Sequence, residues 1–367
     1  MSPTITKLLA LLGSALLSAS AHAAEGKTVH IYNWIEYLPE EILQAFEAET
    51  GIRPVYDVFD SAELLEFKLL SGNSGYDVVF PGSSGIARLI QVGALEPLER
   101  SKLSNWQHLD DRFMQQLVIS GDPGNQYSVP YMWGTTLIGY NVDKVREALG
   151  VDARLDSWEL IFRQDTMAKL SSCGVGFIDS ASEIFPIALR YLGLAPHSLE
   201  ASDYQQAKQL MLGIRPYITY FNSSRYGMDL ANGDICVGVG WSGGVAQAST
   251  LAKAAGNGVK IEMILPREGA PMWIDVMVIP KGTPHIDEAH AFINYILRPE
   301  VIAKISNALG YPNANKDATA LVDESIRGNP AMYVPDDRLP LLYSLQGLPL
   351  AAERLRTRAW SAIRAGK

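Results

Sequence analysis

The chain has 367 residues, 47% of them hydrophobic, and a formal net charge of −9 at pH 7. This length allows about two domains, each with a substantial core. The acidic balance argues against nucleic-acid binding and is compatible with a small cationic ligand.

The first 23 residues have the pattern of a secretory signal peptide. Lys7 precedes the apolar run LLALLGSALLSAS, and Ala21-His22-Ala23 forms an A-x-A cleavage site before Ala24. This run is too short to span a hydrocarbon core of ~30 Å, which disfavours a membrane anchor. We therefore expect a mature periplasmic chain without a membrane span.

Strand-like and helix-like segments alternate along the next part of the chain. Strands are predicted at residues 28–34 (TVHIYNW), 53–59 (RPVYDVF) and 76–82 (YDVVFPG). Helices are predicted between them, at residues 39–51 and 61–72, from their apolar spacing and helix-start residues. This alternation is the βαβ rhythm of an α/β fold.

The middle and the end of the chain add longer elements. Residues 127–141 (YSVPYMWGTTLIGYN) form an extended run without a helix, suited to a crossing between lobes. Further strands are predicted at residues 259–266 and 272–280, and an amphipathic helix or helix pair at residues 287–306.

Residues 240–244 (GWSGG) match the G-x-S-x-G nucleophile elbow of serine hydrolases. Asp275 and then His285 or His290 follow Ser242 in the chain order of an α/β-hydrolase triad. However, Asp275 lies inside a predicted strand, His285 lies in a turn, and no HGGG-like segment precedes the elbow. A secreted hydrolase that uses Ser242 is therefore a remote alternative.

Aromatic and acidic residues, together with a few glycines and serines, recur where predicted strands end. They are Trp34, Glu36, Tyr37, Gly82, Ser83, Ser84, Asp179, Glu183, Trp241, Ser242, Trp273, Asp275 and Tyr311. Ligands of open α/β sheets bind beyond the carboxyl ends of the strands. Indole faces attract ammonium groups and carboxylates pair with them, so this set suits a cationic, partly aliphatic ligand. Taken singly, each residue is explained more simply as core or cap; their joint placement favours a site.

The two cysteines, Cys173 and Cys236, form a disulfide in an oxidising compartment or remain as buried thiols. Neither they nor the scattered histidines have the spacing of a zinc cage. We expect no metal and no cofactor.

Nearly the whole mature chain resembles the periplasmic spermidine- and putrescine-binding proteins of bacterial polyamine ABC importers. The resemblance is carried by segments such as YNWIEYLPEEIL, YDVVFPGSSG, PYMWGTTLIGYNVDKV, LANGDICVGVGWSGG and LPREGAPMWIDVMVIPKG. It implies a two-lobed, type II solute-binding fold of the α/β class, with the ligand in the interlobe cleft. The first lobe is expected at residues 24–133 plus about 252–303, and the second at 134–251 plus about 304–367.

The resemblance also implies which residues bind the ligand. They are Trp34, Glu36, Tyr37, Gly82, Ser84, Glu183, Trp241, Trp273, Asp275, Tyr311 and the region of Gln346. It further implies a disulfide between Cys173 and Cys236. It also implies that Ser242 lies in a turn that presents Trp241 to the ligand, and that Ser242 is not a nucleophile.

The chain departs from the family pattern at positions that bear on specificity. Gly244 stands where putrescine binders commonly carry an aspartate, and Ser180 where spermidine binders have an additional one. Ile35 replaces a serine or threonine. One end of a diamine is then poorly matched, which leaves an ω-amino acid such as 4-aminobutyrate or 5-aminovalerate as an alternative ligand, with Arg225 as a candidate partner for its carboxylate.

The sequence thus predicts a binding protein of an ABC importer that captures a linear polyamine by cleft closure. The expected partners are a small cationic amine of the putrescine or spermidine class and an ABC permease in the inner membrane. We expect a monomer that catalyses no reaction and binds no nucleic acid.

Overall fold

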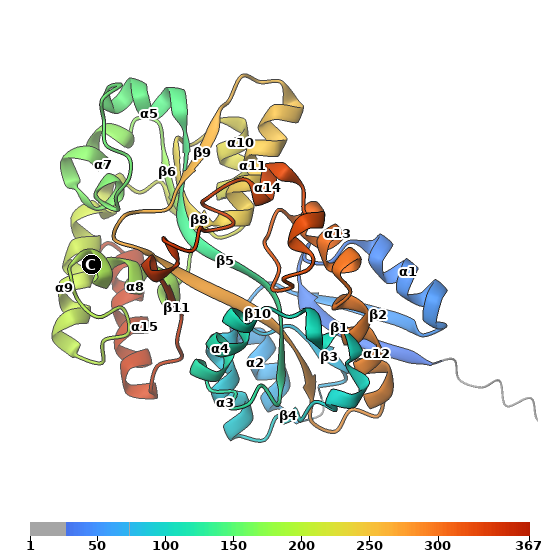
Figure 1. Cartoon of the computed structure of the whole chain (residues 1–367). Coiled ribbons are helices and arrows are strands. Elements are labelled where there is room, and N and C mark those ends of the chain that lie inside the picture. The colour runs from blue at the N-terminus through green and yellow to red at the C-terminus, as the bar shows by residue number, and fades with distance from the viewer. Residues whose placement is uncertain (1–26, 73) are drawn as a thin grey trace, which may run out of the picture.

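The computed structural model describes residues 27–72 and 74–367. The predicted signal peptide lies outside the described residues. Figure 1 shows two groups of helices and strands, or lobes, bridged by the long strands β5 and β10. Within the part of the chain that is described, none of the helices is long and apolar enough to span a bilayer.

The strands are β1 (Thr28–Trp34), β2 (Arg53–Phe59), β3 (Val78–Val79), β4 (Leu95–Glu96), β5 (Ser128–Asn141), β6 (Val175–Phe177), β7 (Tyr220–Phe221), β8 (Val237–Trp241), β9 (Ile261–Ile264), β10 (Ala270–Pro280) and β11 (Leu342–Ser344).

The helices are α1 (Glu40–Thr50), α2 (Ala62–Leu70), α3 (Ile86–Gln91), α4 (Asp111–Ile119), α5 (Val142–Leu149), α6 (Glu159–Phe162), α7 (Gln164–Leu170), α8 (Ala181–Tyr191), α9 (Ala201–Ile214), α10 (Tyr226–Asn232), α11 (Ser242–Ala255), α12 (Ile286–Ile296), α13 (Pro299–Leu309), α14 (Glu324–Arg327) and α15 (Leu350–Arg364).

The local sequence explains why these elements begin and end where they do. Helix α1 follows Pro39, carries Glu40 in its first turn and ends at Gly51, whose φ of 69° is left-handed. Helix α2 is capped by Ser61, whose hydroxyl accepts a hydrogen bond from the backbone N–H of Leu64 at 3.3 Å. The expected α/β class is confirmed.

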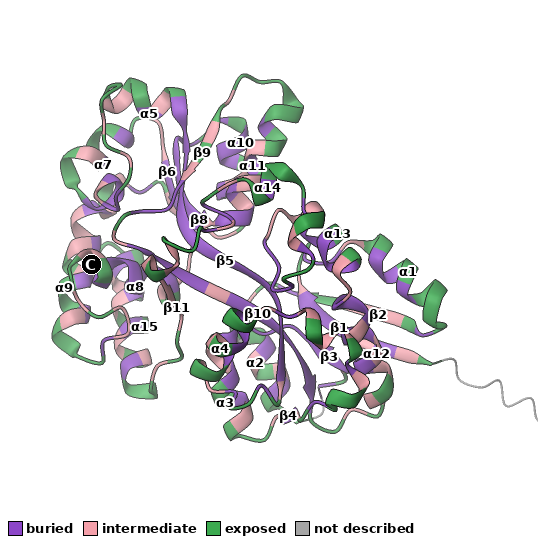
Figure 2. Cartoon of the chain, in the orientation of Figure 1, coloured by how far each residue is buried: buried purple, intermediate pink, exposed green. Residues whose placement is uncertain are grey.

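One sheet runs through both lobes, in the order β2-β1-β3-β10-β5-β8-β6-β7. The first half of β5 pairs antiparallel with β10, and its second half pairs with β8 and β9. All fourteen residues of β5 are buried, and the central strands are purple in Figure 2 whereas the outer helix faces are green. The predicted crossing strand therefore belongs to both lobes at once.

The contacts of the later segments bear on the lobe boundaries. Strand β9 pairs with the second-lobe half of β5, whereas Val301 and Ile305 of α13 pack in one buried cluster with Ile31 and Phe46 of the first lobe. Helix α15 packs on the second lobe through Trp360, which contacts Phe185. We therefore propose a first lobe of residues 27–133 plus about 270–333 and a second of about 134–269 plus 340–367.

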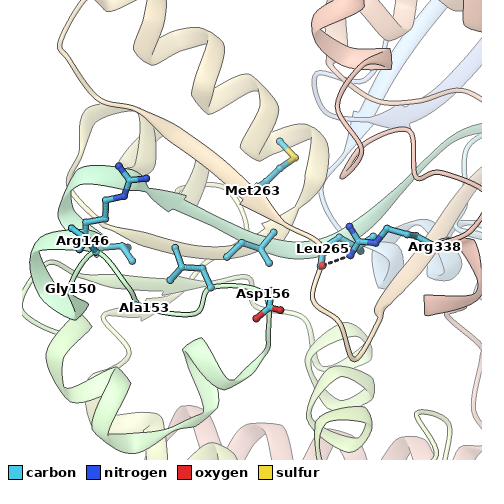
Figure 3. Close-up of a pocket in the computed structure, with 11 residues that line it drawn as sticks. Arg146, Gly150, Ala153, Asp156, Met263, Leu265 and Arg338 are labelled. Atoms are coloured by element: carbon cyan, nitrogen blue, oxygen red, sulfur yellow. Dashed lines mark hydrogen bonds between the residues drawn. The ribbon is translucent and has the colours of Figure 1, made fainter.

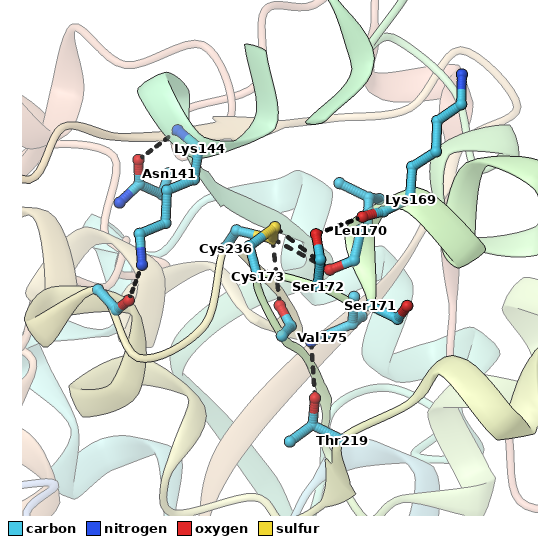
Figure 4. Close-up of a disulfide and its surroundings, with 12 residues drawn as sticks. Asn141, Lys144, Lys169, Leu170, Ser171, Ser172, Cys173, Val175, Thr219 and Cys236 are labelled. Carbon is cyan, nitrogen blue, oxygen red and sulfur yellow. Dashed lines mark hydrogen bonds between the residues drawn. A yellow bond between two sulfur atoms is a disulfide. The ribbon is translucent and has the colours of Figure 1, made fainter. Parts of the chain in front are cut away.

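A disulfide joins Cys173 to Cys236, with a Cα–Cα distance of 5.4 Å (Figure 4). Cys173 lies shortly before β6 and Cys236 immediately before β8, and these two strands are parallel neighbours. The bond therefore fixes the N-terminal ends of both strands, opposite the ends that carry the predicted site residues. The expected cysteine pair is confirmed.

Replacing both cysteines, Cys173→Ala with Cys236→Ala, should lower the free energy of unfolding by roughly 4 kcal/mol, because a cross-link across 63 residues restricts the unfolded chain. Urea unfolding with and without a reductant checks this. The wild type should lose stability on reduction and the double variant should not respond. An unchanged wild-type midpoint after complete reduction, verified by thiol titration, would contradict the prediction.

Candidate ligand-binding site

The first lobe contributes a turn directly after β1. Glu36 in this turn has a φ of 56°, in the left-handed region that costs a non-glycine residue on the order of 1 kcal/mol. The turn lies between Trp34 and Tyr37. The hydroxyl of Tyr37 donates a hydrogen bond to Oδ2 of Asp275 at 2.9 Å, although the two residues are far apart in sequence.

Asp275 lies at an irregularity of β10. The pairing of β10 with β5 shifts register between Ile274 and Val276, and Asp275 instead forms an isolated bridge with Gly82. The extra residue is in β5, because Tyr131 and Met132 lie opposite Asp275 between the paired residues Pro130 and Trp133. Asp275 keeps the regular alternation of β10 and lies on the same face as Trp273. Its carboxylate is only 9% exposed and lies beside Gly82 and Ser84.

The second lobe contributes Glu183 from the first turn of α8, where it is 7% exposed. The indole N–H of Trp241 donates to both of its carboxylate oxygens, at 3.0 and 3.1 Å. The hydroxyl of Thr136, on β5, also donates to it. Glu183 and Trp241 therefore orient each other at the ends of neighbouring second-lobe elements.

Two buried hydroxyls fix the turn between β8 and α11. Tyr226 Oη accepts from the backbone N–H of Trp241 at 3.0 Å and donates to its carbonyl at 3.1 Å. The same Oη lies 2.0 Å from where a Cβ on Gly244 would be, so residue 244 has no room for a side chain. Ser242 is 1% exposed and its Oγ accepts from the N–H of Thr135 at 3.3 Å. Its hydroxyl therefore belongs to the framework of the turn.

Tyr311 packs between aromatic residues of the first lobe and helix α11 of the second lobe. Its ring lies edge-on to Tyr37 and Trp273, with centroids 5.7 and 5.3 Å away. A Cβ on Gly243 of α11 would lie 2.2 Å from this ring, and a Cβ on Gly134 would lie 2.4 Å from the indole of Trp273. Glycines thus allow both rings to lie directly on the backbone, and the aromatic wall extends from β10 to α11.

The two buried acids, Asp275 and Glu183, both have a raised pKa. Burial raises the pKa of Asp275 to about 7, against the Tyr37 hydrogen bond that lowers it, and the charge of Glu183 raises it further. Burial also raises the pKa of Glu183, in opposition to hydrogen bonds from Thr136 and Trp241. Among the described residues, no lysine, arginine or histidine contributes to either shift. A cation between these carboxylates would favour their ionised forms.

Some predicted residues lie outside this constellation. Glu36 and Gln346 are exposed, although the chain after Gln346 approaches the first lobe: a Cβ on Gly347 would lie 2.7 Å from the carbonyl of Ser84. Trp34 contacts Phe59, with ring centroids 4.5 Å apart, and is half-buried.

Two charged residues considered from the sequence have other partners. Asp179 accepts from the indole of Trp360 at 2.8 Å and pairs with Arg364 at 2.9 Å, so it anchors α15. Arg225 pairs with Asp229 at 3.1 Å and its side chain is 60% exposed.

Thr136 and Tyr226 were not found from the sequence. Thr136 sits in an apolar strand and Tyr226 begins a short helix, and neither belongs to a motif. Their roles depend on pairings between elements that are distant in the sequence.

The structure does not assemble a hydrolase triad. His290 Nε2 accepts from the N–H of Glu99 at 2.9 Å, which leaves Nδ1 to donate to the carbonyl of Ile286 at 2.7 Å. His285 stacks against His30. In the described part of the chain, neither histidine is hydrogen-bonded to Ser242.

Two hollows of the surface lie away from these residues. One of about 460 Å³ is lined by Arg146, Asp156 and Arg338 among others, and the Arg338 guanidinium donates to the Leu265 carbonyl at 2.9 Å (Figure 3). Another, of about 290 Å³, is lined by Trp133, Met272 and Tyr333 among others. Met272 precedes Trp273 in β10, so this hollow is on the opposite face of the strand. No predicted site residue lines either hollow.

The free energy of unfolding of the ligand-free protein should decrease as the pH rises from about 4 to about 7. In this range the folded protein keeps Asp275 protonated, with its pKa near 7, while the unfolded chain has lost that proton, so folding is linked to proton uptake. Asp275→Asn should remove this part of the pH dependence and should be more stable than the wild type at pH 7, by on the order of 3 kcal/mol.

Urea unfolding at several pH values checks this prediction, with Asp337→Asn as a control at an exposed carboxylate. Identical pH profiles for the wild type and Asp275→Asn would contradict it.

Comparison with known proteins defines the family. The family of bacterial extracellular solute-binding proteins matches residues 41–333. The putrescine-binding periplasmic protein PotF of Escherichia coli K12 is 48% identical over 363 residues, 98% of each chain. The putrescine-binding periplasmic protein SpuD of Pseudomonas aeruginosa UCBPP-PA14 is 46% identical over 360 residues, again 98% of each.

Solved structures agree with the sequence comparisons. The spermidine/putrescine ABC transporter substrate-binding protein PotD of Streptococcus pneumoniae has a TM-score of 0.79 at 25% identity, over 93% of this chain and 99% of that one. With the family match over most of its length, the chain belongs to the bacterial extracellular solute-binding proteins.

Proposed function

We propose that this protein is the periplasmic binding component of an ABC importer and captures a linear polyamine of the putrescine or spermidine class between its lobes. The observation that carries the proposal is the pair of buried carboxylates, Asp275 and Glu183, one from each lobe, which lack a cationic partner among the described residues. The putrescine-binding relatives support it.

The chemistry of a polyamine fits this arrangement. Its ammonium groups pair with Asp275 and Glu183, and its methylene chain packs on the faces of Trp241, Trp273 and Tyr311. Burying methylene groups contributes about 0.8 kcal/mol each. The aromatic wall therefore selects an aliphatic chain, while the carboxylates select charge at its ends.

Binding proceeds by closure of the two lobes around the crossing strands. Closure excludes water and strengthens each carboxylate–ammonium pair, because the local dielectric constant falls. The closed form is then delivered to a permease in the inner membrane. In this proposal no bond is made or broken, the protein needs no cofactor, Ser242 is a framework residue, and the protein acts as a monomer that does not bind nucleic acid.

Asp275→Asn should weaken putrescine binding by about 30-fold or more, since it removes one partner of a desolvated charge pair. Trp241→Ala should weaken it by about tenfold or more, because it removes the indole face from the ligand. Titration calorimetry on refolded, ligand-stripped protein measures both effects.

Ser242→Ala is a control from the same turn as Trp241. It leaves the buried N–H of Thr135 without its acceptor, so it should lower the free energy of unfolding. Because it removes no group proposed to touch the ligand, it should still bind putrescine within about twofold of the wild type. Wild-type affinity in both Asp275→Asn and Trp241→Ala would show that the pocket is elsewhere. Loss of binding confined to Ser242→Ala, together with turnover of a chromogenic ester by the wild type, would favour the hydrolase alternative.

A second ligand class has specific observations in its favour. Residues 180 and 244 carry no carboxylate, and the indole N–H of Trp273 is a buried donor without an acceptor among the described residues. An ω-amino acid would place its own carboxylate near such a donor. Two acids still face the site, however, and they repel a ligand carboxylate.

A panel of putrescine, cadaverine, spermidine, 4-aminobutyrate and 5-aminovalerate separates the two classes by calorimetry. We expect putrescine or spermidine to bind at least about tenfold more tightly than either amino acid, because Asp275 and Glu183 both favour positive charge. Tight binding of 5-aminovalerate alone would instead mean that the changes at residues 180 and 244 have respecified one end of the cleft.

A further inference from the structure

Two histidines and an aspartate meet at the edge of the first lobe that faces away from the candidate ligand site. His30 is in β1, Asp77 directly precedes β3, and His285 directly precedes α12. Trp34 lies four residues farther along β1, which is roughly 13 Å at the rise of a β-strand. The cluster therefore lies at the N-terminal ends of β1 and β3, whereas the candidate site lies beyond their C-terminal ends.

The three side chains present their polar atoms to one another. One ring nitrogen of His30, one of His285 and one carboxylate oxygen of Asp77 all lie within 4.8 Å of each other. The two imidazole rings are 6.0 Å apart between centroids and inclined by only 26°. Asp77 is 2% exposed, whereas both histidines are half-buried and so remain reachable from solvent.

Hydrogen bonds hold the carboxylate of Asp77 in place. Its Oδ2 accepts from the backbone N–H of His30 at 2.7 Å, and its Oδ1 accepts from the hydroxyl of Thr283. Thr283 in turn accepts from the N–H of His285 at 3.1 Å. Each carboxylate oxygen has a further lone pair. The carboxylate is thus oriented by both histidine-bearing segments, as outer partners orient metal ligands.

The imidazole rings of His30 and His285 are free to act as ligands. In the described part of the chain, neither ring forms a hydrogen bond, although each is half-buried beside a carboxylate. The rings of His290 and His108 differ, since His290 is bonded through both nitrogens and His108 binds Asp317 at 2.7 Å.

We propose that His30, Asp77 and His285 bind a divalent transition-metal ion of the zinc class. Two imidazole nitrogens and one carboxylate oxygen are a common ligand set for zinc, and three protein ligands leave a fourth position for water. The set is too poor in oxygen for calcium or magnesium. Tetrahedral ligands at zinc distances are about 3.4 Å apart, so each group must move by roughly 0.7 Å, within the reach of side-chain rotation.

Such an ion would join three segments of the first lobe: β1, the loop before β3 and the turn after β10. It would stabilise this lobe without contacting the residues proposed to hold the amine. The inference is therefore independent of the proposed function.

The test is calorimetric titration of zinc into untagged full-length mature protein treated with a chelator. We expect one ion per chain, and at least about tenfold weaker binding in His30→Gln and in His285→Gln. His108→Gln is the matched control, because it removes an imidazole that faces a single carboxylate, and it should bind zinc as the wild type does. Magnesium should give no binding.

Two further measurements keep the result decisive. Zinc should raise the thermal unfolding midpoint of the wild type but not of the two variants, whose midpoints in chelator should match the wild type. Cobalt should give the intense visible absorption of a four- or five-coordinate site. Absence of zinc binding, equal affinity in the variants, or the weak spectrum of hydrated cobalt would each overturn the proposal. Putrescine affinity should not change in any arm.

Discussion

The antiparallel pairing of β5 with β10 is the constraint on which the rest of the structure depends. These strands carry residues of both halves of the candidate site: Asp275 and Trp273 are on β10, and Thr136 on β5 holds Glu183 of the second lobe. This pairing, with one irregularity opposite Asp275, fixes the first-lobe half of the site relative to the second-lobe half. The placement of both acids therefore depends on the same pair of strands.

Burying two acids without a cation opposes folding. The raised pKa of Asp275 and of Glu183 means that the ligand-free protein gives up part of its stability at neutral pH to keep these groups in place. A ligand that brings positive charge reverses this effect, so binding and stability are coupled. The disulfide is at the opposite ends of β6 and β8 and supports the second lobe without touching the site.

Much of the fold follows from local sequence, and much of the site does not. Apolar patterning predicted the strands at 28–34 and 53–59 with their observed bounds, and Pro299 explains why residues 287–306 form two helices. The cysteine pair was predicted through family resemblance, and so were Glu183 and Trp241 as site residues, but the contact between these two was not. The bulge in β5 opposite Asp275 and the role of Tyr226 were not predicted either, because both arise from pairings between distant segments.

The contact of Tyr226 with Gly244 has an evolutionary consequence. Any side chain at residue 244 displaces the tyrosine hydroxyl, so an acid can enter there only if Tyr226 moves or residue 226 becomes smaller. A smaller residue 226, however, releases the backbone of Trp241, which the hydroxyl now holds at both its N–H and its carbonyl. We therefore expect residues 226 and 244 to change together in evolution, which ties the recognition of charge at residue 244 to the support of the tryptophan.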